Sequence, residues 1–359
     1  MKKILIFIIL PIFVIIIIFL ITKENLNLNK LLKKIEQNTD INILLKNQQK
    51  WGFYPLIYYK NKISINNKNN TLIIENSNIS ITKDYWFTTP FKIKLDSPSI
   101  LYKGLNFRNS ILTSDYKKNI FYLNKFTADI IDGNIDINGT LQFNNEKKLV
   151  LKGTYKNIDL NRVLKQLNIA DWERVQIKIS SPNFKVITNN TSAEDIIRNL
   201  NGEIDLLGSI FFVSTEEDLF GAALLSLLTD KIKNMIPLSE SINYLLKNFS
   251  NKPSNISGKI FINQGILSTE KLLLENKKGK ALISAILDIS TNNIDGKIDL
   301  YNEDKIFLTA ELRGNLQNPE ILIGGELFAK DGKNKPQNIK EMFQNGIESL
   351  IDNILKLNE

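Results

Sequence analysis

Hydrophobic and polar residues alternate with a period of two over much of the chain. In the clearest segment Ile135, Ile137, Leu141 and Phe143 point one way, while the even-numbered residues between them are polar. The same alternation occurs over residues 91–96, 175–179 and 294–300. Strict alternation is typical of a strand with one face buried and the other in water. The pattern therefore predicts many half-buried β-strands.

Short turn-forming sequences separate these segments, among them Asp132-Gly133-Asn134 and Asn292-Asn293. Short turns and one-sided alternation favour antiparallel over parallel sheet. We predict a mainly β fold of the α+β class. Its body is a long, curved, mostly antiparallel sheet with an apolar inner face and a few short capping helices.

Helical patterns are few. Residues 159–167 place four apolar side chains on one helical face, and residues 215–235 and 239–249 have capping signals. Pro237 is the predicted stop between the last two. The C-terminal region, residues 331–359, contains an amphipathic helix. We expect these helices to cover the edges of the sheet; for the last one a place on a membrane surface is the alternative.

The N-terminus has the pattern of a membrane anchor. Lys2 and Lys3 precede an unbroken apolar run, Ile4–Ile21. Such a run makes about 27 Å of helix, close to the roughly 30 Å hydrocarbon core of a bilayer. No small-residue cleavage site follows, which favours an uncleaved anchor over a cleaved signal peptide. We predict a single-pass bacterial inner-membrane protein with a cytoplasmic N-terminus and its bulk in the periplasm.

The composition excludes several classes of chemistry. Cysteine and histidine are both absent, which excludes disulfides, thiolate metal sites and imidazole bases. The net charge is +8, but only five of the 46 cationic residues are arginine, and the lysines are scattered. Nucleic-acid surfaces cluster their cations and favour arginine. We therefore expect no nucleic-acid partner, and because no catalytic, cofactor or metal motif is present we expect a protein that is not an enzyme.

A series of short motifs occurs in a fixed order along the chain. They are Thr39–Ile43 after the anchor, Asp132–Gly139, Asn157–Leu160 leading into a predicted helix, Leu200–Gly202, Asn263–Thr269, Ile294-Asp295 and Gly314–Pro319. In this order the chain resembles the AsmA family of anchored envelope proteins, which belong to a wider group with repeating β-groove, chorein-like folds. The family's glycine-rich strand entry is weak here, with Ala281 and Ala285 after Gly279.

The resemblance implies both an organisation and a function. It divides the chain into an anchor (1–22), an N-terminal AsmA-like β region (23–200), a C-terminal AsmA-like β region with a helical insertion (201–330, insertion 215–249) and the C-terminal helix (331–359). The family is linked to outer-membrane biogenesis, to the assembly and membrane targeting of outer-membrane proteins, and to phospholipid traffic. It supplies no catalytic residue.

Two function classes remain open from the sequence. In the first, the apolar faces form a groove that binds or passes phospholipid acyl chains. The candidate lipid-contacting residues are Ile135, Ile137, Leu141, Phe143, Ile283, Leu287, Ile289, Ile294, Ile298 and Leu300. In the second, the same faces close as an ordinary core, and the protein is a scaffold whose partners are outer-membrane assembly proteins. Alternation alone does not separate these hypotheses.

Overall fold

The computed structural model describes the chain as a mainly β protein. The residues that it describes are 41–45, 50–52, 56–67, 72–84, 91–102, 104–117, 120–142, 148–166, 175–189, 198–215, 236–303, 305–315, 320–324 and 337–338. Within these ranges the helices are α3 (Leu160–Gln166) and α6 (Ile236–Phe249), and all other elements are strands. Neither helix is long and apolar enough to cross a bilayer. The predicted anchor, the helix over 215–235 and the C-terminal helix lie outside the described residues.

The chain divides into two compact units. The N-terminal unit consists of Met1–Asp171, Ile179–Ile204 and Ile262–Gly265, and the C-terminal unit consists of Trp172–Lys178, Asp205–Phe261 and Ile266–Glu359. Three of the limits between them fall within β10 (Val175–Asn189), β11 (Asn201–Phe212) and β12 (Pro253–Asn263).

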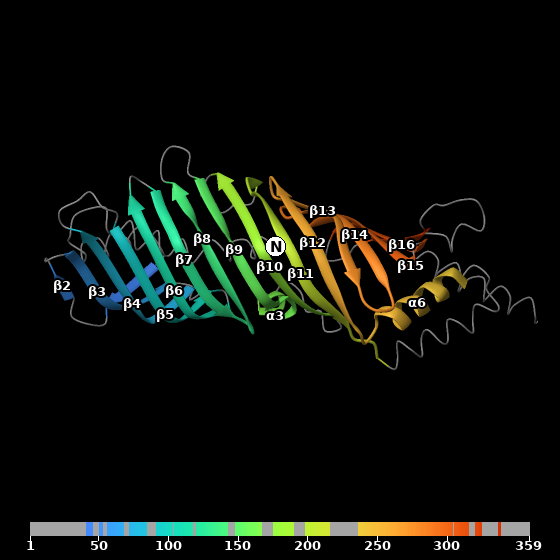
Figure 1. Cartoon of the computed structure of the whole chain (residues 1–359), viewed down its shortest axis with the longest axis horizontal. Coiled ribbons are helices and arrows are strands. Elements are labelled where there is room, and N and C mark those ends of the chain that lie inside the picture. The colour runs from blue at the N-terminus through green and yellow to red at the C-terminus, as the bar shows by residue number, and fades with distance from the viewer. Residues whose placement is uncertain are drawn as a thin grey trace, which may run out of the picture. The chain divides into compact units, whose positions relative to one another are not determined.

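The N-terminal unit is built by hairpins that follow one another in chain order (Figure 1). Its further strands are β1 (Ile41–Leu45), β2 (Lys50–Gly52), β3 (Leu56–Asn67), β4 (Leu72–Asp84), β5 (Phe91–Tyr102), β6 (Leu105–Lys117), β7 (Ile120–Ile130), β8 (Gly133–Gln142) and β9 (Lys148–Asp159). From β3 to β9 each strand pairs antiparallel with the next, and β1 and β2 both pair with β3. The mostly antiparallel sheet predicted from alternation is thus confirmed in this unit.

The turn between β7 and β8 lies one residue earlier than the sequence predicts. Ile130 pairs with Gly133, so the two turn residues are Ile131 and Asp132, with φ of 39° and 43°. Two consecutive positive φ values are typical of the type I′ turn that joins tightly twisted strands. Gly133 belongs to the strand, where an added Cβ would lie 2.4 Å from the Lys156 carbonyl oxygen.

Buried serines mark a bulge that crosses β4, β5 and β6. In β4 the buried positions change phase at Asn76, and in β6 they change phase at Asn109. Both asparagines have positive φ, 53° and 50°, a conformation that asparagine tolerates better than most residues. The buried Ser77 donates to Ser97 Oγ at 2.7 Å, and Ser97 donates to a backbone carbonyl of its own strand. The register shifts at this level where β4 pairs with β3 and where β6 pairs with β7. These bulges keep the apolar side chains of β4 and β6 on one face along 13 residues.

The apolar face of the N-terminal unit is a closed core. Ile74, Phe107, Phe121 and Phe126 are at most 1% exposed. The rings of Phe107 and Phe126 contact each other, with centroids 6.5 Å apart. α3, which occupies the segment predicted to be helical, buries Val163 and Leu164.

The C-terminal unit continues with antiparallel hairpins. Its strands after β12 are β13 (Ile266–Glu275), β14 (Lys280–Asp288), β15 (Asn293–Asn302), β16 (Lys305–Asn315), β17 (Glu320–Gly324) and β18 (Gln337–Asn338), each paired with the next. α6 begins at Ile236, three residues before the start at Ser239 that the sequence predicts, and the residues before Ile236 lie outside the described part of the chain. Pro237 lies in the first turn of α6, where its missing N–H leaves no helical bond unmade.

Candidate functional site

One face of β13–β16 is apolar from edge to edge. In the register of β14 and β15, Ile283 pairs with Ile298, Leu287 with Ile294, and Ala281 with Leu300. Directly paired residues point to the same face of a sheet, so these side chains lie together. The neighbouring strands add cross-strand partners to the same face. We call this face the apolar wall; it comprises Leu267, Leu272, Leu274, Ala281, Ile283, Ala285, Leu287, Ile294, Ile298, Leu300, Leu308, Ala310 and Leu312.

The opposite face is polar along β15 and β16, whereas β13 and β14 place Ile266, Leu273, Leu282 and Ile286 on it. Lys297 and Asp299 form an ion pair at 2.8 Å, and Thr309 Oγ1 donates to the Asp299 carboxylate at 2.7 Å. Arg313 and Glu311 form another ion pair at 2.7 Å. The strands therefore have the two-faced pattern that the sequence predicts for 294–300.

Exposure along the apolar wall is graded. At the end nearest the β13–β14 turn, Ala281, Leu300 and Leu308 are at most 4% exposed. α6 lies at this end, because the Tyr244 ring is 4.7 Å from that of Phe307. Two residues further along β15, Ile298 and its β14 partner Ile283 are only half-buried. Six residues further along, Ile294 and its β14 partner Leu287 are also half-buried. The wall is thus covered at one end and partly open toward the other.

A row of small residues crosses the partly open region. Thr269 of β13 pairs with Ala285 of β14, which pairs with Gly296 of β15. A Cβ added to Gly296 would have its nearest neighbour, Ala285 Cβ, at 3.4 Å, an ordinary van der Waals contact. The Thr269 hydroxyl is buried and has no hydrogen-bond partner among the described residues. The side chains of this row are the smallest on the apolar wall, and the Thr269 hydroxyl is a donor without an acceptor among the described residues.

The candidate lipid-contacting residues fall into two environments. In β8, Ile137 and Leu141 are 3% and 2% exposed and belong to the closed core, while Ile135 is half-buried. Phe143 lies outside the described residues. Leu300 and Ile289 are each 4% exposed, and Ile289 follows the end of β14. The remaining four candidates, Ile283, Leu287, Ile294 and Ile298, are brought together in the partly open region of the apolar wall.

Two tyrosines and one aspartate among the described residues have shifted pKa values. Burial raises the pKa of Tyr102 and of Tyr155 to about 12, which keeps both phenols neutral. Hydrogen bonds from Ser290 lower the pKa of Asp288, whose carboxylate closes the turn after β14. No group of carboxylates suitable for a metal ion occurs among the described residues.

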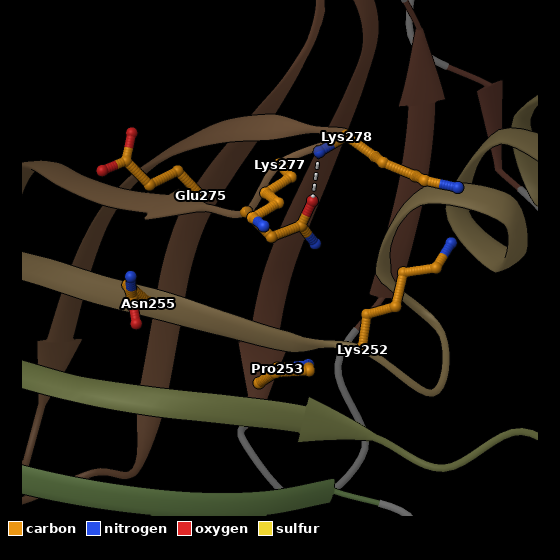
Figure 2. A pocket seen from close by; sticks show the side chains of 7 residues that line it. Lys252, Pro253, Asn255, Glu275, Lys277 and Lys278 are labelled. Atoms are coloured by element: carbon orange, nitrogen blue, oxygen red, sulfur yellow. Dashed lines mark hydrogen bonds between the residues drawn. The ribbon is translucent and has the colours of Figure 1, made fainter.

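The sequence analysis missed a basic pocket at the β13–β14 hairpin. The pocket has a volume of about 620 Å³ and is lined by Lys252, Pro253, Asn255, Glu275, Asn276, Lys277 and Lys278 (Figure 2). Lys252 is far from the other two lysines along the chain, so reading the lysines as scattered concealed it. Only the antiparallel fold brings the start of β12 beside the end of β13.

Comparisons with protein-family models, with curated proteins and with solved structures find no match to this chain.

Proposed function

We propose that this chain is an inner-membrane-anchored periplasmic protein of the AsmA type that acts in outer-membrane biogenesis. In this proposal it binds or passes phospholipid along an apolar β surface. The C-terminal unit contacts the acyl chains, and the residues that do so are Ile283, Leu287, Ile294 and Ile298. The protein has no catalytic residue in this role, and its partner is membrane lipid.

The observation that supports this proposal is the partly open apolar wall. A β-sheet in a water-soluble environment normally covers its apolar face, as the N-terminal unit does with Phe107 and Phe121. In the C-terminal unit, four large aliphatic side chains on two adjacent strands stay half-buried. An apolar ligand would remove the remaining surface from water.

Burial of an acyl chain on this surface makes a favourable contribution to lipid binding. Four strands at about 4.8 Å spacing offer roughly 15 Å of apolar surface across the sheet. If half of a sixteen-carbon chain lies on this surface, burial contributes about 6 kcal/mol at about 0.8 kcal/mol per CH₂ before the entropy of association.

The sharpest test compares two adjacent residues of one strand that face opposite sides. A photoreactive amino acid is placed at Ile283 on the wall or at Ser284 on the opposite face, in the full chain in its native membrane. We expect phospholipid adducts by mass spectrometry at Ile283 and none at Ser284. Adducts at neither position, or equally at both, would end the lipid-binding proposal for this surface.

The proposed location has its own test. A reporter that is active only in the periplasm should be active when it is fused after Glu359. Activity of a cytoplasm-specific reporter at the same position would contradict the proposed topology.

A second candidate function is supported by the closed core of the N-terminal unit. Ile137 and Leu141 are buried as ordinary core residues, so this unit offers no apolar surface along β8. A scaffold that influences the assembly or membrane targeting of outer-membrane proteins would need only such a closed fold. The Ile283 and Ser284 comparison separates the two functions, because a scaffold gives no lipid adduct on the wall.

A further inference from the structure

Three lysines line one pocket of the C-terminal unit, and two of them come from a single turn. Lys252 lies just before β12, and Lys277 and Lys278 lie between β13 and β14. Figure 2 shows the side chains of Lys252 and Lys278 extending toward each other, while the carboxylate of Glu275 points away from them. The pocket is thus lined by three lysines and by one carboxylate that is turned aside.

Asn276 fixes the turn that presents two of these lysines. Its side-chain oxygen accepts hydrogen bonds from the backbone N–H of Lys278 at 2.8 Å and of Gly279 at 3.0 Å. Its amide group donates to the Asn248 carbonyl oxygen at 2.9 Å and to Ser254 Oγ at 2.8 Å. One side chain therefore joins the turn to the end of α6 and to β12, so that the lysine backbones are preorganised.

The lysines of this pocket differ from other lysines of the same unit that have carboxylate partners. Lys297 is paired with Asp299, and Lys259 is paired with Asp205 at 3.3 Å. In the described part of the chain, neither Lys277 nor Lys278 has a carboxylate within ion-pair distance. Lys252 donates to the carbonyl oxygen of Lys247 in the last turn of α6, which leaves its positive charge formally uncompensated.

The negative end of the α6 dipole accounts for part of this cluster. Cations near a helix C-terminus are favourable, and the end of the helix is equivalent to about half a negative charge. Three lysines exceed that half charge and the one carboxylate together. A surplus of positive charge therefore remains in the pocket.

We propose that this pocket binds a ligand through a phosphate group, with Lys252, Lys277 and Lys278 as its charge partners. Lysine ammonium groups bind phosphate as point charges. The volume of about 620 Å³ lies in the range of small-molecule sites and leaves room for a phosphate together with the group that carries it. The pocket residues are not part of the apolar wall, so this site is independent of the acyl-chain contact proposed above.

The test uses the full chain in a neutral detergent and measures binding by titration calorimetry. The probes are inorganic phosphate, dihexanoyl phosphatidylglycerol and, as a zwitterionic comparison, dihexanoyl phosphatidylcholine. The double variant Lys277→Gln/Lys278→Gln removes two pocket charges, and Lys271→Gln/Lys305→Gln removes two exposed charges elsewhere in the unit. We expect the pocket variant to bind about twenty-five-fold more weakly than the wild type, at about fivefold for each lysine. The control variant should bind like the wild type.

The arms of the experiment distinguish the source of the phosphate. Saturable binding of phosphatidylglycerol alone supports a lipid headgroup, whereas equal binding of inorganic phosphate supports a free phosphate compound. Either outcome agrees with the proposal if the pocket variant binds the probe more weakly than the control variant does. Absence of saturable binding, an equal loss in both variants, or equal affinity for phosphatidylcholine would overturn it. The photoreactive probe at Ile283 is unaffected by these substitutions, so failure of one proposal does not imply failure of the other.

Discussion

Placing the same charge in each unit shows whether the two apolar faces differ as described. Ile137→Asp puts a carboxyl group in the closed core, where Ile137 is 3% exposed. Ile298→Asp puts the same group on the partly open apolar wall. Both residues lie in the middle of antiparallel strands and both are replaced identically, so strand geometry and chemistry are matched.

The expected costs follow from the environment of the new carboxyl group. In Ile137→Asp no polar partner is available on the buried face, so the carboxyl must stay protonated in the folded state. With an unfolded pKa near 3.9, holding the proton at pH 7 costs about 4 kcal/mol, in addition to about 2 kcal/mol for the lost isoleucine burial. In Ile298→Asp the carboxylate reaches water. The cost there is about 1 to 2 kcal/mol of lost apolar contact.

The pH dependence has a definite sign. Because burial raises the folded-state pKa of the carboxyl group that Ile137→Asp introduces, the penalty grows as pH rises above the unfolded pKa. Lowering the pH from 7 to 5 should therefore return about 2.7 kcal/mol to this variant. Ile298→Asp should show no comparable recovery.

Local stability is measured by hydrogen exchange, because two units need not unfold together. Peptides covering β8 and β9 should lose protection in Ile137→Asp and regain much of it at pH 5. Peptides covering β14 and β15 should stay protected in Ile298→Asp, while phospholipid adducts at Ile283 disappear. If Ile298→Asp loses protection as strongly and recovers in the same way at low pH, the wall is a closed core and the lipid-binding proposal is refuted.

Three further predictions test other parts of the structure. Gly296→Leu fills the small-residue row and should abolish lipid adducts at Ile283, while thermal unfolding stays close to that of the wild type. Two control variants should keep the adducts: Gly296→Ala, whose added Cβ makes only ordinary contacts, and Ser284→Leu on the opposite face. Tyr102 is only 3% exposed, and burial raises its pKa to about 12. The free energy of unfolding should therefore fall by about 2 kcal/mol between pH 10 and pH 12. Unfolding followed by circular dichroism should show a smaller fall for Tyr102→Phe. Asn109→Val should cost about 1 to 2 kcal/mol in urea unfolding because φ is 50°, whereas Asn109→Gly should cost less; equal costs would show that the backbone conformation is not the cause.

The sequence predicted strands best where alternation is unbroken. The segment around Ile294 and Ile298 forms β15 with the predicted apolar and polar faces. The strands with bulges were harder, because at Asn76 and Asn109 the alternation changes phase. A period-two pattern fails at such a point, although the strand continues.

The candidate site could be predicted only in part. Alternation identifies which side chains share a face, as it did for Ile283 and Leu287, but the covering of that face depends on elements elsewhere in the chain. Ile137 and Ile298 have the same local pattern, and only one of them is in a closed core. Lys252 and Lys277 line one pocket because β12 and β13 are neighbours in the sheet, which no local signal in the sequence indicates.

The hairpin series from β3 to β9 also bears on how such a protein can change in length. Each strand in this series hydrogen-bonds to the strands before and after it in the chain. Insertion or loss of one whole hairpin therefore leaves every other pairing partner adjacent in sequence and keeps the inward and outward faces in phase. Each such event would lengthen or shorten the sheet by about 10 Å. The extent of the apolar surface is then a quantity that genetic duplication of a segment of about 25 residues can adjust in steps, without redesign of the existing fold.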